Sequence, residues 1–294
     1  MSTFLNASIN EATPFPDGQQ HVAFGHIKDG SEQTLTCRIV TAKDFVNVAL
    51  AVDVLKSHKC KIDLRIVYLM GARMDRRLSE REPYTLKAMT NLVNSLDVDS
   101  VTVFCPHSKT TLDLLKNYSE YDNTLLNAEE MFYDFCTLIF LRKFHPSLQE
   151  FRAAPMNAEI RNLTKNARFS IVYPDEGAKK RYVKSQLLIN FPHADLVTLS
   201  KDREERTGII KGMKIVDGTP EKCCIIIDDL CDGGATFKGA AKALKENGAQ
   251  YVALAVSHGI FSKGLPIEGV DWVGTTNSFR EEKIDGLDYF FKLA

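Results

Sequence analysis

The chain lacks long apolar runs, a signal sequence and an excess of charge of either sign. No run approaches the roughly 18 apolar residues of a membrane-spanning helix, and the first residues have neither the basic region nor the apolar core of a signal peptide. The 294 residues include 37 Lys and Arg against 38 Asp and Glu, so the net charge is −1. Because proteins that bind nucleic acids usually carry a basic excess, we expect a cytoplasmic protein with no nucleic acid and no membrane as partner.

The sequence also lacks the cysteine spacing of a metal or redox motif. Seven cysteines are present, none of them in a Cys-x-x-Cys pair, and several lie within apolar runs. We therefore expect reduced, mostly buried thiols. Apolar residues make up 44% of the chain and charged residues 26%, as is usual for a soluble globular protein of one large or two medium domains.

Strand-like and helix-like patterns alternate along the chain. The predicted strands cover residues 36–40, 64–70, 100–105, 169–173, 195–199, 223–228 and 251–257. The predicted helices cover residues 44–57, 84–95, 179–190 and 238–247. This alternation predicts doubly wound, mainly parallel sheets. Because there are two successive sets, we expect two related α/β lobes, at 1–150 and 151–294, with ligands at the carboxyl ends of the strands.

The most informative segment is the end of the strand at 223–228. Its last residue is Asp228, and Asp229 comes directly after it, so that two carboxylates stand side by side. The segment continues with Asp232, Gly233, Gly234, Ala235 and Thr236. The order matches neither the dinucleotide fingerprint nor the Walker A motif. Backbone N–H groups at a glycine-rich turn and a helix N-terminus form an anion site, and we expect Thr236 to cap that helix. Since Asp228 and Asp229 suit sugar hydroxyls or a magnesium ion, we interpret the segment as a site for ribose 5-phosphate.

Charged side chains also follow the other predicted strands. Arg73, Asp75 and Arg76 follow the second strand, where arginine forks would match phosphate oxygens, although a solvated helix start is the alternative. His107 and Asp175 follow the third and fourth strands. Together they could hold a Mg²⁺ that also binds a triphosphate. The alternatives are a structural histidine and a helix-capping aspartate.

A charged stretch without apolar residues, 200–206, follows the strand at 195–199, and we expect a mobile loop there. Lys201 and Arg203 are two residues apart, so both can point the same way in an extended chain. Such a cationic pair could close over a charged transition state. A solvated surface run is the alternative.

Seven segments, taken in this order, resemble the signature segments of the ribose-phosphate pyrophosphokinase family over roughly residues 15–280. They are 15–19, 72–77, 106–107, 173–175, 201–203, 228–236 and 257–262. The resemblance implies two phosphoribosyltransferase-like α/β lobes. It implies transfer of the β,γ-diphosphate of MgATP to the 1-hydroxyl of ribose 5-phosphate, giving 5-phosphoribosyl 1-pyrophosphate and AMP for nucleotide and NAD synthesis. Such chemistry requires alignment and charge neutralisation, not a covalent nucleophile.

The resemblance also assigns roles to residues. Asp228 and Asp229 would hold the ribose hydroxyls, and Lys201 and Arg203 would be catalytic. The 5-phosphate would be bound by Asp232, Gly233, Gly234, Ala235 and Thr236. ATP would be bound by Phe15, Asp17, Gln19, Arg73, Asp75, Arg76 and His107, and the Mg²⁺ by His107 and Asp175. Because the segment from Phe15 to Gln19 would complete the adenine site of a neighbouring subunit, a homo-oligomer of two or more chains is expected.

The chain departs from the family pattern in several places. Met74 replaces a usual glutamine, Gln19 a usual glutamate, Gly233 a usual threonine and Ala235 a usual glycine. Ala235 is tolerable only if its φ is negative. An extra segment at about 115–165 contains a helical pattern, which we interpret as a helix packed on the N-terminal lobe or as an altered subunit contact.

Two other functions use the same acidic loop. A type I phosphoribosyltransferase would consume the product instead of making it. It would leave the arginine cluster, His107 and the pair of Lys201 and Arg203 without a necessary role. A non-catalytic regulatory relative of the synthetase would bind the sugar phosphate without turnover. It would be favoured by loss of the loop cations or the metal ligands, which are present here.

Overall fold

The structure is a computed structural model of the chain. The residues it describes are 2–6, 9–11, 14–119, 131–132, 134–136, 139, 168–183, 191–203 and 210–293. The backbone divides into two compact units. Unit 1 comprises Met1–Asn127, Asn277–Glu281 and Lys292–Ala294, and unit 2 comprises Ala128–Thr276 and Glu282–Phe291. The lobe boundary predicted at residue 150 lies outside the described residues and stays a prediction.

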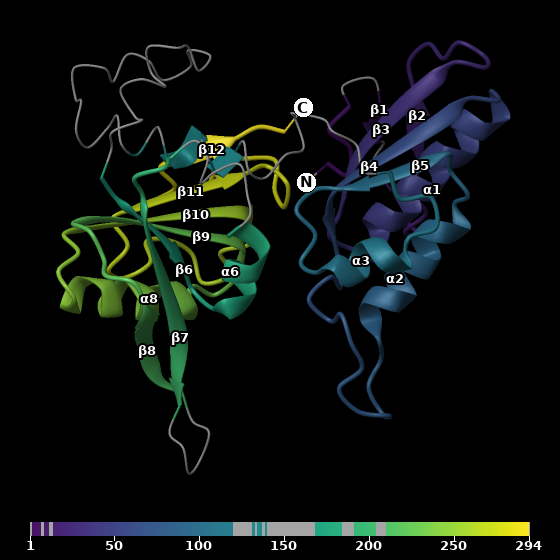
Figure 1. The fold of residues 1–294 in the computed structure, drawn as a ribbon. Coiled ribbons are helices and arrows are strands. Elements are labelled where there is room, and N and C mark those ends of the chain that lie inside the picture. The colour runs from purple at the N-terminus through teal and green to yellow at the C-terminus, as the bar shows by residue number, and fades with distance from the viewer. Residues whose placement is uncertain are drawn as a thin grey trace, which may run out of the picture. The chain divides into compact units, whose positions relative to one another are not determined.

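Unit 1 is built on a parallel three-stranded sheet in the order β3-β4-β5 (Figure 1). Its elements are β1 (Ile9–Glu11), β2 (Val22–Phe24), β3 (Glu32–Ile39), α1 (Ala42–Ser57), β4 (Lys61–Leu69), α2 (Thr85–Ser95), β5 (Ser100–Val103) and α3 (Lys109–Leu114). The strands β1 and β2 form a separate antiparallel pair that the sequence did not reveal. Helix α1 starts two residues earlier than predicted because Thr41 and Asp44 form a capping box.

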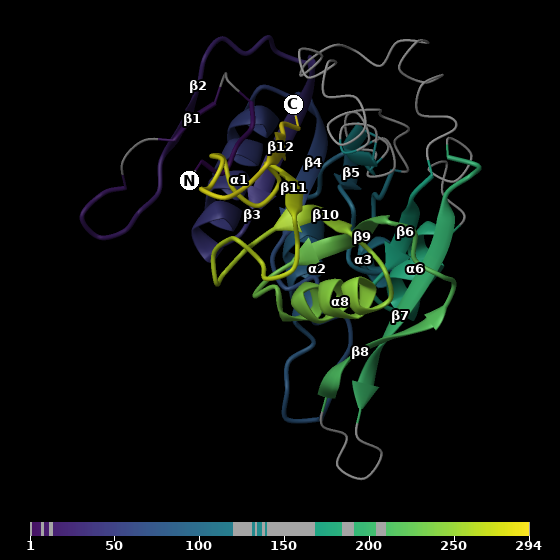
Figure 2. The same cartoon turned by 90° about the vertical axis from the view of Figure 1, so that its left-hand side faces the viewer.

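Unit 2 is built on a seven-stranded sheet in the order β12-β11-β10-β9-β6-β7-β8. Its elements are β6 (Ser170–Tyr173), α6 (Glu176–Tyr182), β7 (Asp195–Arg203), β8 (Ile210–Asp217), β9 (Cys223–Cys231), α8 (Ala235–Glu246), β10 (Tyr251–Gly259), β11 (Trp272–Thr276) and β12 (Tyr289–Phe291). Among these strands only β7 and β8 pair antiparallel. Figure 2 shows α8 beside β10 and α6 beside β6 and β7, in agreement with their packing contacts.

The order of these strands reverses between β6 and β9. From β6 the chain crosses through α6 to β7 on one side, and from β9 it crosses through α8 to β10 on the other. In a sheet of this kind, ligands bind outside the carboxyl ends of the strands at the point of reversal. The carboxyl ends of β6 and β9 are therefore the expected binding position in unit 2.

Two aromatic residues of the extra segment, Phe132 and Phe135, pack on other residues of unit 2. Phe132 makes an edge-to-face contact with Tyr182, with ring centroids 5.1 Å apart. Phe135 makes edge-to-face contacts with Trp272 at 5.9 Å and Tyr289 at 5.4 Å. The sequence interpretation had assigned this segment to the N-terminal lobe. Most of the predicted helix lies outside the described residues.

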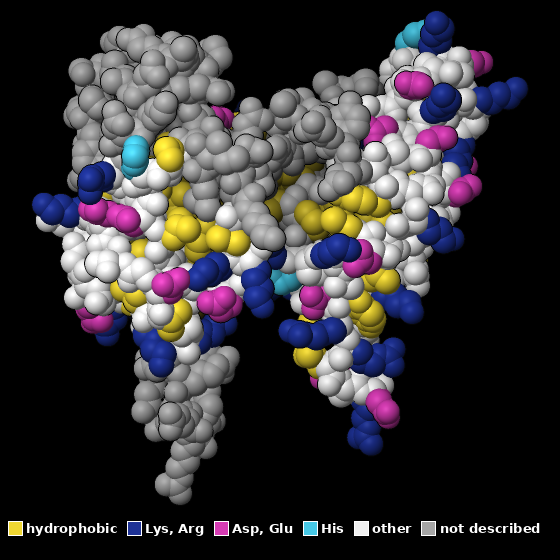
Figure 3. Space-filling model, viewed as in Figure 1, with side chains coloured by type: hydrophobic (Ala, Val, Ile, Leu, Met, Phe, Trp, Pro, Cys, Tyr) yellow, Lys and Arg dark blue, Asp and Glu magenta, His cyan; other side chains and the backbone are white. Residues whose placement is uncertain are grey.

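All seven cysteines are buried and free, which confirms the prediction of buried thiols. In Figure 3, Lys and Arg side chains are interspersed with Asp and Glu on the viewed faces of the described residues. None of the helices in the described part of the chain is long and apolar enough to cross a membrane.

Candidate functional site in the second unit

The phosphate-cradle segment forms the connection from β9 to α8. Strand β9 runs to Cys231, three residues beyond the predicted end, so both acids of the pair lie on the strand. Gly234 is the N-cap of α8 and adopts the left-handed conformation, with a φ of 77°. The prediction that Thr236 caps the helix is wrong, because Thr236 already lies within the first turn of α8.

The backbone of this turn accommodates the departures from the family pattern. The positive φ falls on Gly234, and Ala235 is the first helical residue, so Ala235 meets the condition of a negative φ. An added Cβ on Gly234 would lie 3.1 Å from Cγ1 of Ile267. Glycine is therefore required at 234 by its conformation and by its close neighbour, whereas alanine fits at 235.

The two acids at the end of β9 are held close together. The backbone N–H of Asp229 donates to Oδ1 of Asp228 at 2.9 Å, and the Asp229 side chain is buried. The pKa of Asp228 is raised well above its ordinary value, first by burial and then by the negative charge of Asp229. The charge of Asp175, which follows β6, raises it further. The point of strand reversal therefore gathers three carboxylates whose mutual repulsion a cation or hydroxyl donors would relieve.

Arg181 on α6 supplies positive charge to this cluster. Its Nη1 lies 3.0 Å from Oδ1 of Asp229, an ion pair whose angle is not that of a hydrogen bond. The sequence interpretation gave Arg181 no role. One feature could have pointed to Arg181: it lies on α6, the helix that follows β6, and β6 pairs with β9.

Asp175, predicted as a Mg²⁺ ligand, is the N-cap of α6. Its Oδ1 accepts a hydrogen bond from the backbone N–H of Ala178 at 2.9 Å, so the capping alternative is realised. His107 lies between β5 and α3 in unit 1. Within the described ranges, no cluster of three or more His, Cys, Asp or Glu side chains suits a metal ion. The pairing of His107 with Asp175 around Mg²⁺ stays a prediction.

The predicted ATP contacts all belong to unit 1. Arg73, Asp75 and Arg76 lie in the turns after β4, and Arg76 Nε is 3.8 Å from Oδ1 of Asp75. In the segment before β2, Phe15 and Gln19 close a tight turn, with the Phe15 N–H donating to the Gln19 carbonyl at 3.0 Å. The Asp17 carboxylate accepts from the Gln19 N–H at 3.0 Å. The Phe15 side chain is 52% exposed, and an exposed ring is free to stack on a ligand.

Lys201 and Arg203 were predicted to lie in a loop. They lie instead at the end of strand β7. Lys201 is opposite Met213 of β8, and Arg203 is opposite Ile210, with a register shift between Asp202 and Arg203. The Lys201 side chain is exposed. The strand was not predicted beyond residue 199 because residues 200–203 contain no apolar residue and so show no apolar alternation. Residues 204–209 lie outside the described residues.

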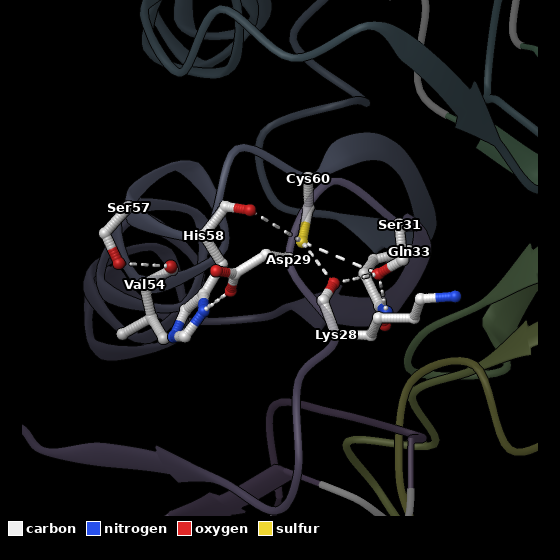
Figure 4. Close-up of polar contacts among 8 residues, drawn as sticks. All are labelled: Lys28, Asp29, Ser31, Gln33, Val54, Ser57, His58 and Cys60. Atoms are coloured by element: carbon white, nitrogen blue, oxygen red, sulfur yellow. Dashed lines mark hydrogen bonds and ion pairs between the residues drawn. The ribbon is translucent and has the colours of Figure 1, made fainter.

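A cysteine, a histidine and an aspartate also meet in unit 1 (Figure 4). The imidazole Nδ1 of His58 is 2.6 Å from Asp29, whereas the Cys60 thiol lies 3.9 Å from the backbone carbonyl of His58 and not beside its ring. The thiol also lies 3.8 Å from the carbonyl of Lys28. Since a nucleophilic thiol needs the ring nitrogen of its base, this arrangement is not a catalytic dyad.

The fold of the chain is that of two phosphoribosyltransferase-like α/β lobes with mainly parallel sheets. The crystal structure of phosphoribosylpyrophosphate synthetase from Mycobacterium smegmatis matches it with a TM-score of 0.72 at 19% sequence identity. That match covers 96% of this chain and 86% of the other.

Sequence comparison finds similar proteins that share one name. No family model matches the chain. Ribose-phosphate pyrophosphokinases from Mycoplasma pneumoniae and Haemophilus influenzae are 26% and 27% identical to it, covering 94% and 95% of this chain and 78% and 82% of their own lengths. The one from Maricaulis maris is 28% identical over 74% of this chain, which spans only 60% of that relative. The chain is thus similar in sequence to ribose-phosphate pyrophosphokinases, the family whose signature segments the seven segments resemble.

Proposed function

We propose that the protein is a ribose-phosphate diphosphokinase. It transfers the β,γ-diphosphate of MgATP to the 1-hydroxyl of ribose 5-phosphate and releases AMP. One observation carries the proposal: at the point of strand reversal, an acid pair leads into a left-handed glycine turn and an open helix N-terminus. The carboxylates that would bind sugar hydroxyls lie before the turn from β9 to α8, and the N–H groups that would bind a phosphate lie after it. This arrangement matches the two ends of a ribose 5-phosphate.

The acids at the end of β9 hold the ribose. Asp228 and Asp229 accept hydrogen bonds from its hydroxyls, and the ion pair with Arg181 orients Asp229. The raised pKa of Asp228 reflects crowding of negative charge. Hydroxyl donors or a cation stabilise the charged form of Asp228, so substrate binding lowers this pKa.

Asp175 offers a carboxylate, the kind of ligand that a hard divalent cation prefers. Asp175 uses Oδ1 for the helix cap, and its carboxylate charge acts on the acid pair. Carboxylate oxygens are preferred Mg²⁺ ligands, so Asp175, with His107, would hold the ion. When bound, Mg²⁺ neutralises the triphosphate and withdraws charge from the leaving α-phosphate.

The cations of β7 assist the transfer. Lys201 and Arg203 would stabilise charge on the diphosphate as it passes between the two oxygens. On the nucleotide side, Arg73, Asp75 and Arg76 would bind the phosphates. The exposed Phe15 ring would stack on the adenine bound by a neighbouring subunit, and Asp17 and Gln19 would reach the same adenine site. The active form would then be a dimer or a larger oligomer.

The nucleotide product tests this proposal. Protein incubated with MgATP and ribose 5-phosphate should release AMP, resolved by ion-exchange chromatography, and omission of the sugar phosphate should abolish it. Release of ADP instead would contradict the proposal. Binding of ribose 5-phosphate without turnover would indicate the regulatory relative. Consumption of 5-phosphoribosyl 1-pyrophosphate with a nucleobase would indicate a phosphoribosyltransferase.

A further inference from the structure

The loop that follows β10 is tied to the phosphate-cradle turn. The hydroxyl of Ser262 donates to Oδ1 of Asp232 at 2.6 Å, and the Ser262 N–H donates to the Asp232 carbonyl at 3.2 Å. The N–H groups of Ile260 and Phe261 donate to the carbonyl of Cys231 at 2.9 and 3.2 Å. These four hydrogen bonds fix the position of residue 263 relative to the cradle.

The residue at that position is Lys263, and its stem lies over Gly233. An ideal Cβ on Gly233 would be 3.5 Å from both Cδ and Cε of Lys263 and 3.7 Å from its Cγ. Three consecutive carbons of the lysine therefore run alongside the backbone of the cradle. The ammonium group is one bond beyond Cε, so it lies within reach of a group bound at the turn.

The charge balance of the turn requires a cation at this place. Asp228, Asp229 and Asp232 place three carboxyl groups at the turn or just before it, and a phosphate monoester adds about two negative charges at neutral pH. The N-terminus of α8 contributes only about half a positive charge. Two nearby cations are already engaged: Arg181 with Asp229 and Lys238 with Glu268.

Lys263 differs from both of these cations. Its side chain is exposed, and it makes no ion pair within the part of the chain that the structure describes. An ammonium held beside an anion site, with no carboxylate of its own, is available to an incoming phosphate.

We propose that Lys263 is a further binding residue for the 5-phosphate of the sugar substrate. The Lys263 ammonium donates a hydrogen bond to the phosphate from beside the turn. Gly233 cannot donate such a bond because it has no hydroxyl. This inference rests on the proposed function of the same site. Lys263 selects for the phosphate group and takes no part in the transfer step, so it should affect affinity for ribose 5-phosphate and leave the nucleotide site unchanged.

Binding of ribose 5-phosphate to the full chain, measured by isothermal titration calorimetry, tests this role. A charge-assisted hydrogen bond corresponds to an affinity loss of about 10- to 100-fold, and we expect Lys263→Met to raise the Kd for ribose 5-phosphate by that factor. Lys263→Arg, which keeps the charge, should recover most of it. The loss should shrink at high salt, which a packing defect would not show. Lys242→Met, at an exposed lysine of α8, is the matched control.

The outcomes separate the inference from the proposed function. If the unaltered protein binds ribose 5-phosphate and Lys263→Met changes its Kd by less than about twofold, Lys263 is a solvated lysine and the proposed function stands. Equal losses for ribose 5-phosphate and ATP in Lys263→Met would indicate a folding defect and would also overturn the assignment. If the unaltered protein binds no ribose 5-phosphate, both proposals are wrong.

Discussion

The Nη1 of Arg181 lies 3.0 Å from Oδ1 of Asp229 and joins helix α6 to the end of strand β9. The Asp229 side chain is only 6% exposed, so its charge has little water to stabilise it. The pair therefore links the stability of unit 2 to the geometry of the acid pair.

Substitution of Arg181 should lower the stability of unit 2. Arg181→Met leaves a buried carboxylate without its cation, and we expect a loss of about 3 kcal/mol in the free energy of unfolding at neutral pH. Arg181→Lys keeps a cation and should cost less. Urea denaturation followed by circular dichroism measures both. A loss below about 0.5 kcal/mol for the methionine variant would show that the ion pair is only a surface contact.

Asp228 should make stability depend on pH in a particular direction. Its folded-state pKa is raised, so its ionised form destabilises the fold, and this cost disappears as the pH falls. Asp228→Asn should therefore increase the free energy of unfolding by about 0.5–2 kcal/mol at pH 8. The gain should shrink toward zero as the pH approaches the ordinary value of 3.8.

Thermal unfolding of both proteins across this pH range measures the difference. The same substitution at Asp285, an exposed acid of unit 2, should change little at any pH. A constant difference between Asp228→Asn and the parent protein at every pH would contradict the account of crowded charge.

The cradle turn should tolerate alanine at one glycine and not at its neighbour. Gly234→Ala combines a positive φ with a Cβ that lies 3.1 Å from Ile267, so we expect a loss of about 1–2 kcal/mol. Gly233→Ala meets nothing closer than 3.5 Å and has no positive φ, so its loss should be under about 0.5 kcal/mol. Equal losses in chemical denaturation would mean that the left-handed turn is placed wrongly.

Lys201 should act on the transition state and not on ATP binding. Lys201→Ala should lower kcat by about three orders of magnitude, because its contact forms with the charge that develops during transfer. The Kd for ATP should stay within about threefold of the parent value. Lys222→Ala, at an exposed lysine just before β9, is the control. A change in KM alone would remove Lys201 from the transfer step.

Much of the second unit could be predicted because its strands are buried and its turns carry glycine. Strand β9 is a nearly continuous apolar run, and the helix predicted at 238–247 ends within one residue of the observed end of α8. The start of α8 was missed because the left-handed Gly234, and not a hydroxyl side chain, begins the helix. Strand β8 was missed because an edge strand is defined by its pairing with β7, which local sequence does not show.

The site was predicted unevenly for similar reasons. The acids Asp228 and Asp229 are found by their place after an apolar strand. The contacts of Arg181 and Lys263 depend on how α6 and the loop after β10 pack onto neighbouring elements. No spacing along the chain encodes these distances, since each joins segments far apart in the sequence.

The most direct test of the central claim is ³¹P NMR of the protein with MgATP and ribose 5-phosphate. The account predicts a new pair of diphosphate doublets from 5-phosphoribosyl 1-pyrophosphate, rising together with AMP and without free orthophosphate. Growth of ADP or orthophosphate in place of the sugar diphosphate would contradict diphosphoryl transfer.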